Sequence, residues 1–299
     1  MTGKHLIEPL PAPTEVLHPT QEKALGENSE LLARLCNLPP LNAIANQVLA
    51  LSADPDASVE KLSATMQCDP AIAADVLLLA NSSLFGFRSR IQVMHHAIAL
   101  LGLERIKTVA FTAAMRSFVG GGGGRFLRPC WLHSVASAII AEEICAHFAV
   151  KRDVVYPLSL IHDIGRLGLL KSNGKEYSPI LSKRFDNAGH LRSTEREFFK
   201  VDHAVAGGWL VRTWGYPSIF VQVCENHHEP IDKDDSDLLQ VVKISCRIAE
   251  ALGFAAVSYS ESAAYRDLIQ SLPSFIPRKA FPAGADMAAM VEGRLKSIA

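Results

Sequence analysis

The sequence predicts an all-α fold, and three observations lead to this prediction. Apolar residues make up 48% of the 299-residue chain and aromatic residues only 7%, with alanine and leucine dominating, which favours closely packed helices. Apolar residues recur at three- and four-residue spacing in several successive segments. No segment alternates apolar and polar residues over the length of a half-buried strand.

The first half of the chain begins with a leader and continues as helices. Residues 1–28 are rich in proline and polar side chains, cannot bury a core, and are expected to be mobile. Ser58 and Asp69 can each cap a helix, and Pro70 suits the first helical position. The expected helices begin near Ser29 and cover 41–49, 59–66, 71–82, 91–101 and 103–118, with Gly102 at the last break.

A run of five glycines, Gly120 to Gly124, separates this half from the rest of the chain. Glycine has the largest backbone entropy to lose on ordering, so this run is the best candidate for a flexible joint. The alternative is a loop tip inside one domain. The expected organisation is a helical subdomain over 29–119, a linker over 120–125, a second helical subdomain over 126–255 and a helical extension over 256–299.

The second half of the chain carries most of its histidines on expected helices. One helix over 131–148 holds His133. Another over 154–170 holds His162 and Asp163, about 100° apart around a helix axis. Further helices are expected over 203–214, from Pro217 toward His227, and over 237–252, and residues 173–200 are expected to form one or two exposed helices.

These histidines form an ordered series that is typical of a metal site. Imidazole nitrogens and carboxylate oxygens from several helices are what a divalent metal requires. Each residue alone is more typical of a core, surface or cap position, but the set favours one shared pocket. An imidazole-rich pocket favours iron, zinc or nickel over magnesium. The candidate ligands are His133, His162, Asp163, His203, His227 and His228, with Asp202 as a helix cap and candidate binding residue.

Charge and hydropathy narrow the classes of partner. The net charge is −1 and the isoelectric point is near 6.8, so a nucleic-acid partner is not expected. The N-terminus lacks the apolar core of a secretory signal, and no apolar run reaches the length of about 18 residues that a membrane span needs. A cytoplasmic protein without a membrane partner is therefore expected.

Ordered motifs over roughly residues 30–255 resemble the HDOD family, a bacterial signalling relative of the HD and HD-GYP phosphohydrolases. The motifs are LPPL, DPDAS, DPAIAADVLLLANSSLFG, AIALLGLERIK, LIHDIGRLGLL, VDHAVAGGWLVRTWGYP and ENHHEP. The resemblance implies an all-helical fold in which an N-terminal bundle packs against an HD-like bundle. It also implies that the six candidate ligands match the metal-ligand pattern of the HD-GYP enzymes.

The chain departs from that enzyme pattern in three places. Cys246 stands where the closing aspartate is expected, Arg166 replaces a lysine, and no Gly-Tyr-Pro follows His228. A thiolate can bind zinc but is a poor substitute for a carboxylate on magnesium or manganese. The metal site is therefore predicted to be degenerate, with Arg166 as a candidate binding residue and no confident catalytic residue.

Three functions remain open after this comparison. The leading hypothesis is a bacterial regulatory module that binds signalling proteins and a nucleotide messenger such as a cyclic dinucleotide, without significant phosphodiesterase activity. The alternative is a metal-dependent phosphohydrolase acting on a nucleotide or cyclic dinucleotide, in which the metal activates a water molecule. The third is a pocket that keeps a metal for structure only.

Overall fold

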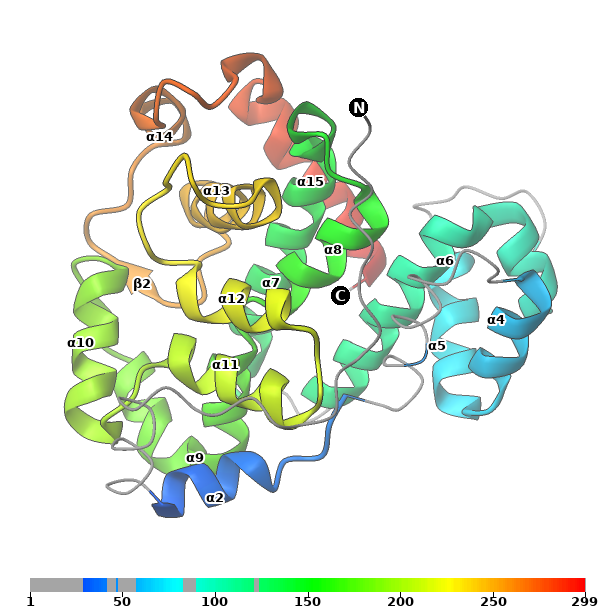
Figure 1. The fold of residues 1–299 in the computed structure, drawn as a ribbon, viewed down its shortest axis with the longest axis horizontal. Coiled ribbons are helices and arrows are strands. Elements are labelled where there is room, and N and C mark those ends of the chain that lie inside the picture. Colours follow the sequence, from blue (N-terminus) through cyan, green and yellow to red (C-terminus); the bar gives the residue numbers. More distant parts are fainter. Residues whose placement is uncertain (1–28, 42–46, 48–57, 83–89, 121–123, 299) are drawn as a thin grey trace.

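The computed structural model describes residues 29–41, 47, 58–82, 90–120 and 124–298, and within them the fold is all-α apart from one pair of two-residue strands. The prediction of an N-terminal helical bundle packed on a second bundle is confirmed (Figure 1). The predicted leader over 1–28, most of the helix over 41–49 and the central glycines 121–123 lie outside the described residues. No helix in the described part of the chain has the length and apolar character needed to cross a bilayer.

The helices of the N-terminal bundle are α4 (Val59–Gln67), α5 (Pro70–Ala80) and the long α6 (Met94–Val119). Their starts follow the predicted capping. The Ser58 hydroxyl accepts a hydrogen bond from the Lys61 amide at 3.2 Å, and the Asp69 carboxylate accepts from the Ile72 amide at 3.2 Å. The predicted break at Gly102 is a kink inside α6 with φ of 77°, a value that favours glycine.

The helices of the second bundle are α7 (Leu127–Ile144), α8 (Arg152–Ile161), α9 (Ile164–Leu181), α11 (His203–Thr213), α12 (Ser218–Asn226) and α13 (Asp237–Ala251). α7 lies at the centre and packs against both α8 and α13 (Figure 1). Small residues suit this position, and Ser134, Ala136 and Ser137 of α7 are fully buried. α11 packs against both α9 and α12.

The adjacent His162 and Asp163 lie at a break between two helices. α8 ends at Ile161, and Asp163 precedes α9 with a non-helical φ of −106° and ψ of 23°. The prediction of one continuous helix over 154–170 is therefore wrong. Neither proline nor glycine occupies the break, so tertiary packing produces it. The two side chains are not held at the spacing of a regular helix.

The remaining elements cover the outside of the second bundle. α2 (Ser29–Cys36) packs on α9 and α11, and α15 (Gly284–Ile298) packs on α7. α10 (Ala188–Phe199) is not wholly exposed as expected, because it buries Leu191 and Phe199. The predicted subdomain boundaries stay a prediction. The short elements are η1 (Cys145–Phe148), α14 (Tyr265–Ser271), η2 (Arg278–Ala280) and the strands β1 (Arg184–Phe185) and β2 (Ser258–Tyr259), which pair in parallel.

Candidate functional site

The predicted ligands come together in one pocket of the second bundle. They arrive from α7, from the break between α8 and α9, from the start of α11 and from the segment after α12, while α13 adds Cys246. Asp163 Oδ1 lies 3.6 Å from His203 Nε2. All of these side chains are buried except His228, which is half-buried. The donor atoms form two groups, each within 4.8 Å: a first group of His133, His162 and Cys246, and a second group of His203, His227 and His228.

Gly165 makes the close approach of α9 to α11 possible. A β-carbon at this position would lie 1.9 Å from the carbonyl oxygen of His203 and 2.4 Å from the amide nitrogen of Gly207. Any side chain would force the two backbones apart. The crossing places Asp163, two residues earlier in the chain, beside His203.

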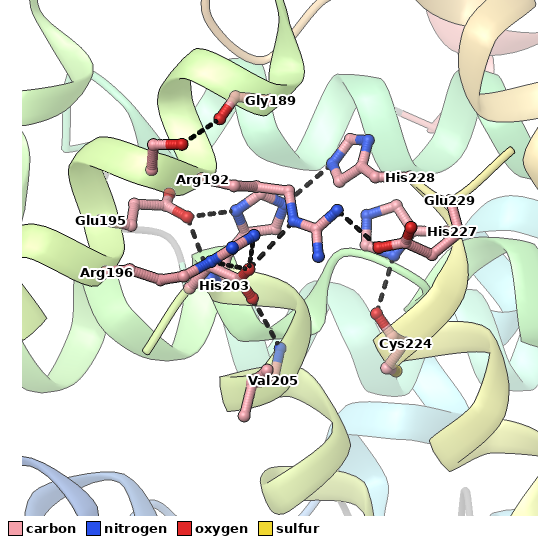
Figure 2. A network of polar contacts seen from close by, with 12 residues as sticks. Gly189, Arg192, Glu195, Arg196, His203, Val205, Cys224, His227, His228 and Glu229 are labelled. Carbon is pink, nitrogen blue, oxygen red and sulfur yellow. Dashed lines mark hydrogen bonds and ion pairs between the residues drawn. The ribbon is translucent and has the colours of Figure 1, made fainter. Parts of the chain in front are cut away.

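Main-chain carbonyl groups fix the tautomers of three imidazoles. The pairs are His133 Nδ1 with the Phe254 oxygen at 3.0 Å, His162 Nδ1 with the Ser159 oxygen at 2.6 Å and His227 Nδ1 with the Cys224 oxygen at 2.8 Å. A carbonyl oxygen only accepts, so each Nδ1 carries the hydrogen and each Nε2 keeps a lone pair. Figure 2 shows the contact of His227 with the Cys224 carbonyl. Outer hydrogen bonds of this kind orient metal-binding histidines.

A buried glutamate holds the fourth imidazole. Glu195 of α10 accepts from His203 Nδ1 at 2.6 Å and from the His203 main-chain amide at 3.0 Å (Figure 2). The Tyr177 hydroxyl donates to the other oxygen of the same carboxylate. Burial alone would raise the pKa of Glu195, but His203 outweighs it and the pKa lies below its usual value. Glu195 therefore stays ionised and leaves His203 Nε2 directed toward the pocket.

The Nε2 atoms of these histidines lie inside the pocket, and few hydrogen-bond donors are available to them. Those of His133 and His162 lie 3.3 Å apart, and both carry lone pairs. The Cys246 thiol, 3.5 Å from His133 Nε2, can donate to only one of them at a time. His227 Nε2 is buried and has no hydrogen-bond partner among the described residues. Unpartnered buried acceptors are costly, so a cation suits this position.

Burial keeps these imidazoles neutral. It lowers the pKa of His133 to about 3, and it lowers the pKa of His162 as well. Burial first, and then the neighbouring histidines, lower the pKa values of His227 and His228 well below their usual range. Burial also raises the pKa of the Cys246 thiol, which remains protonated. Neutral imidazole is the form that binds a metal, so the histidines are ready as ligands.

The positively charged guanidinium of Arg166 lies beside the second group of donor atoms. Its Nε lies 3.1 Å from Asp163 Oδ2 and its Nη2 lies 2.9 Å from His203 Nε2, and both members of the ion pair are buried. Burial alone would raise the pKa of Asp163, but the Arg166 guanidinium and then the histidines hold it well below its usual value. The Asp163 carboxylate is thus an anion already neutralised by an arginine.

Two further ionisable groups of the pocket, a carboxyl group and a phenol, were not predicted from the sequence. Glu250 lies one turn after Cys246 on α13, and burial raises its pKa to about 7. Its carboxyl group interacts electrostatically with Arg166 and Asp163. The Tyr259 hydroxyl of β2 is buried without a hydrogen-bond partner in the described structure. The four-residue spacing after Cys246 was the only sequence signal for Glu250, and Glu195 had none within a segment expected to be exposed.

Asp202 has a structural role at the rim of the pocket. Its Oδ1 accepts from the Val205 amide at 3.0 Å and caps α11, as predicted. Its Oδ2 contacts Arg192 and Arg196, each at 2.9 Å. Arg192 also contacts Glu229 at 2.8 Å, which joins α10 to the segment after the paired histidines (Figure 2). These contacts already use both oxygens of the Asp202 carboxylate. The predicted binding role of Asp202 stays a prediction.

The donor atoms fit one borderline metal ion better than two hard ones. The first group offers two imidazole lone pairs and a sulfur atom. In the second group, the Nε2 of His227 has no hydrogen-bond partner among the described residues, and the His227 ring lies next to the rings of His162 and His203. Nitrogen and sulfur donors suit zinc, iron or nickel. A second ion beside His203 would meet the guanidinium of Arg166 at short range. The arrangement therefore does not fit a pair of metal ions while Arg166 stays in place.

Helices arranged in this way around a His-Asp pair define a helical protein of the HD type. The sequence matches the HDOD domain family over residues 38–230, which is more than half of the chain, and the chain belongs to this family. The resemblance inferred from the sequence is thereby confirmed. Among curated proteins, none matches the chain.

Solved structures share the fold. An HDOD domain protein from Geobacter sulfurreducens is 21% identical with a TM-score of 0.76, over 93% of this chain and 96% of that one. A protein provisionally named a metal-dependent phosphohydrolase, from Shewanella amazonensis SB2B, is 20% identical with a TM-score of 0.61, and the match covers 93% of this chain and 99% of that one. A protein provisionally named a signal transduction protein, from Marinobacter aquaeolei VT8, is 16% identical with a TM-score of 0.69, and the match covers 95% of this chain and 66% of that one. At these identities the similarity concerns the fold.

Proposed function

We propose that the chain is a regulatory signalling module that acts by binding other molecules and does not hydrolyse phosphodiesters. The observation that carries the proposal is the Arg166 guanidinium, which contacts Asp163 and His203 inside the histidine pocket. An arginine there neutralises the carboxylate that a catalytic metal pair would need. Cys246 supports the same proposal, because a buried protonated thiol is a poor ligand for magnesium or manganese.

The proposed partners are other bacterial signalling proteins, and the proposed ligand of the histidine pocket is a cyclic dinucleotide messenger. The name of the Marinobacter aquaeolei neighbour supports a role in signal transduction. Such a ligand would compete with Asp163 for the guanidinium of Arg166, which offers several donors to phosphate oxygens. The cytoplasm is the proposed compartment.

A second candidate function, metal-dependent phosphohydrolysis, is favoured by the three imidazoles, those of His133, His162 and His227, that keep Nε2 lone pairs inside the pocket. His133 and His162 would hold the ion together with the sulfur atom of Cys246. The unpartnered Nε2 of His227 belongs to the neighbouring group. When bound, such an ion supplies Lewis-acid polarisation of a phosphoryl oxygen. If the ion is present without turnover, its role is structural.

Metal analysis combined with a phosphodiesterase assay separates these functions. The protein is purified without chelator, its zinc, iron and nickel are measured by mass spectrometry, and hydrolysis of a cyclic dinucleotide is followed by chromatography. The matched control is Asp163→Asn, which removes the carboxylate charge and keeps the side-chain shape. We expect at most one ion per chain and the same background turnover in both proteins. Turnover above background that Asp163→Asn abolishes would contradict the proposal.

A further inference from the structure

A cavity of about 220 Å³ lies where the N-terminal bundle meets the second bundle and the C-terminal helix. It shares no residue with the histidine pocket. Figure 1 shows the C-terminal end of α15 beside α6 and α8, the helices that form its walls. The lining residues are Leu79, Ser82, Arg105, Thr108, Val109, Thr112, Glu142, Arg152, Tyr156, Arg294 and Ile298.

The lining of this cavity carries excess positive charge. Three guanidinium groups, from Arg105, Arg152 and Arg294, face one carboxylate, that of Glu142. The carboxylate is already engaged, because Arg294 pairs with it at 2.5 Å. Within the described part of the chain, Arg105 and Arg152 take part in no ion pair. Two positive charges are therefore left without a counter-charge around a partly enclosed space.

Polar atoms in the walls also lack partners. Arg294 Nε and the Ser82 hydroxyl are buried without hydrogen bonds to any described residue. The Tyr156 hydroxyl lies 3.0 Å from Thr112 Oγ1 and links α8 to α6. Burial raises the pKa of Tyr156 to about 12, so this hydroxyl keeps its proton. Unpartnered buried donors are costly, and the oxygens of an anion would satisfy them.

We propose that this cavity binds a small phosphoryl-bearing anion, either free phosphate or a compact phosphate monoester. Guanidinium groups match phosphate oxygens with paired hydrogen bonds, and three of them converge here from α6, α8 and α15. Leu79, Val109 and Ile298 provide apolar walls for a small organic body. The volume is below the range of roughly 300–1,000 Å³ typical of drug-sized ligands, so a dinucleotide does not fit.

The position of the site suits an input to the proposed signalling role. α8 carries Arg152 and Tyr156 in the cavity and ends at Ile161, directly before His162. The distance along this helix from Arg152 to His162 is about 15 Å. An anion held by α6, α8 and α15 would fix the N-terminal bundle and the C-terminal helix against the helix that leads into the histidine pocket. The binding itself does not depend on whether that pocket is catalytic.

Calorimetric titration of the full chain tests the site. The probes are inorganic phosphate and ribose 5-phosphate, with ribose as the uncharged control, at constant ionic strength. We expect a phosphoryl probe to bind and ribose not to bind. Arg105→Gln and Arg152→Gln should each weaken binding by about 10-fold to 100-fold, the usual effect of losing a charged hydrogen bond. Both side chains are exposed, so these variants should fold.

Arg266→Gln is the matched control, because Arg266 is an exposed arginine on α14 that does not line the cavity. It should bind the probes as the unchanged protein does. Tighter binding of ribose 5-phosphate than of inorganic phosphate would assign the site to a phosphate monoester, and equal binding would assign it to free phosphate. The proposal is overturned if neither phosphoryl probe binds, or if Arg105→Gln and Arg152→Gln bind as tightly as Arg266→Gln.

Discussion

Single residues set the chemistry of the histidine pocket through their charge states. His133 and His162 are buried near Arg166, so protonating either imidazole would place another positive charge in an interior that already holds one. Asp163 is the anion that balances Arg166. The Asp163 carboxylate is therefore neutralised without a metal ion, yet the pocket retains neutral nitrogen donors. This balance distinguishes it from a site in which a metal ion is the sole cation.

Stability of the metal-free protein should fall on acidification. His133 has a pKa of about 3 in the folded state, whereas an unfolded histidine has a pKa of about 6.5. Between these values the unfolded chain binds a proton that the folded chain lacks, so stability rises with pH and is lost as pH falls. From pH 7 to pH 5 this residue alone should cost about 2 kcal/mol. His227 and His228 act in the same direction.

Urea unfolding of chelator-treated protein at pH 7 and pH 5 measures this loss. His133→Gln should reduce the difference in unfolding free energy between the two pH values. His96→Gln should leave the difference unchanged, because His96 is exposed on α6. An unfolding free energy that is the same at both pH values would show that the imidazoles are not held neutral.

At the scale of elements, local signals predicted helix starts and missed contacts made by packing. Ser58, Asp69 and Gly102 act through their own neighbours in sequence, so their caps and kink could be predicted. The break before Asp163 could not be predicted, because no local residue type causes it. Glu195 was missed for the same reason, since its partner His203 belongs to another helix.

The crossing of α9 and α11 should tolerate no side chain at residue 165. Gly165→Ala would place a methyl group 1.9 Å from the His203 carbonyl oxygen, so the two helices must separate. We expect a loss of about 1–3 kcal/mol or more in unfolding free energy, as for other overpacked cores. Gly174→Ala in the same helix is the matched control, because nothing lies within 4 Å of its added carbon.

Chemical denaturation of both glycine variants checks this prediction. Gly174→Ala should be neutral or stabilise by about 0.5–1 kcal/mol, because alanine favours the helix. Gly165→Ala should also change the metal content or metal affinity of the histidine pocket, since the crossing positions Asp163 and His203. Equal stability of the two variants would mean that α9 and α11 approach less closely than described.

At the scale of the whole molecule, one continuous core joins segments that the sequence analysis treated as separate. Buried apolar residues of α6, α7, α13 and α15 belong to the same cluster. The candidate ligands could be identified from the sequence because histidine is chemically conspicuous. The role of residues 256–299 could not be predicted, since an apolar face of a helix does not indicate which other helix it packs against. In the structure their last helix, α15, packs on α7, which carries His133.

The C-terminal helix should therefore contribute to the stability of the whole molecule. Met287 of α15 is fully buried, whereas Met290 on the same helix is only partly buried. Met287→Ala should lower the unfolding free energy by about 2–4 kcal/mol, because it removes apolar contacts and leaves a cavity. Met290→Ala should cost less than half as much. Urea unfolding followed by tryptophan fluorescence reports on this directly, since Trp131 lies on α7. If both variants unfold like the unchanged protein, α15 does not form part of the cooperative core.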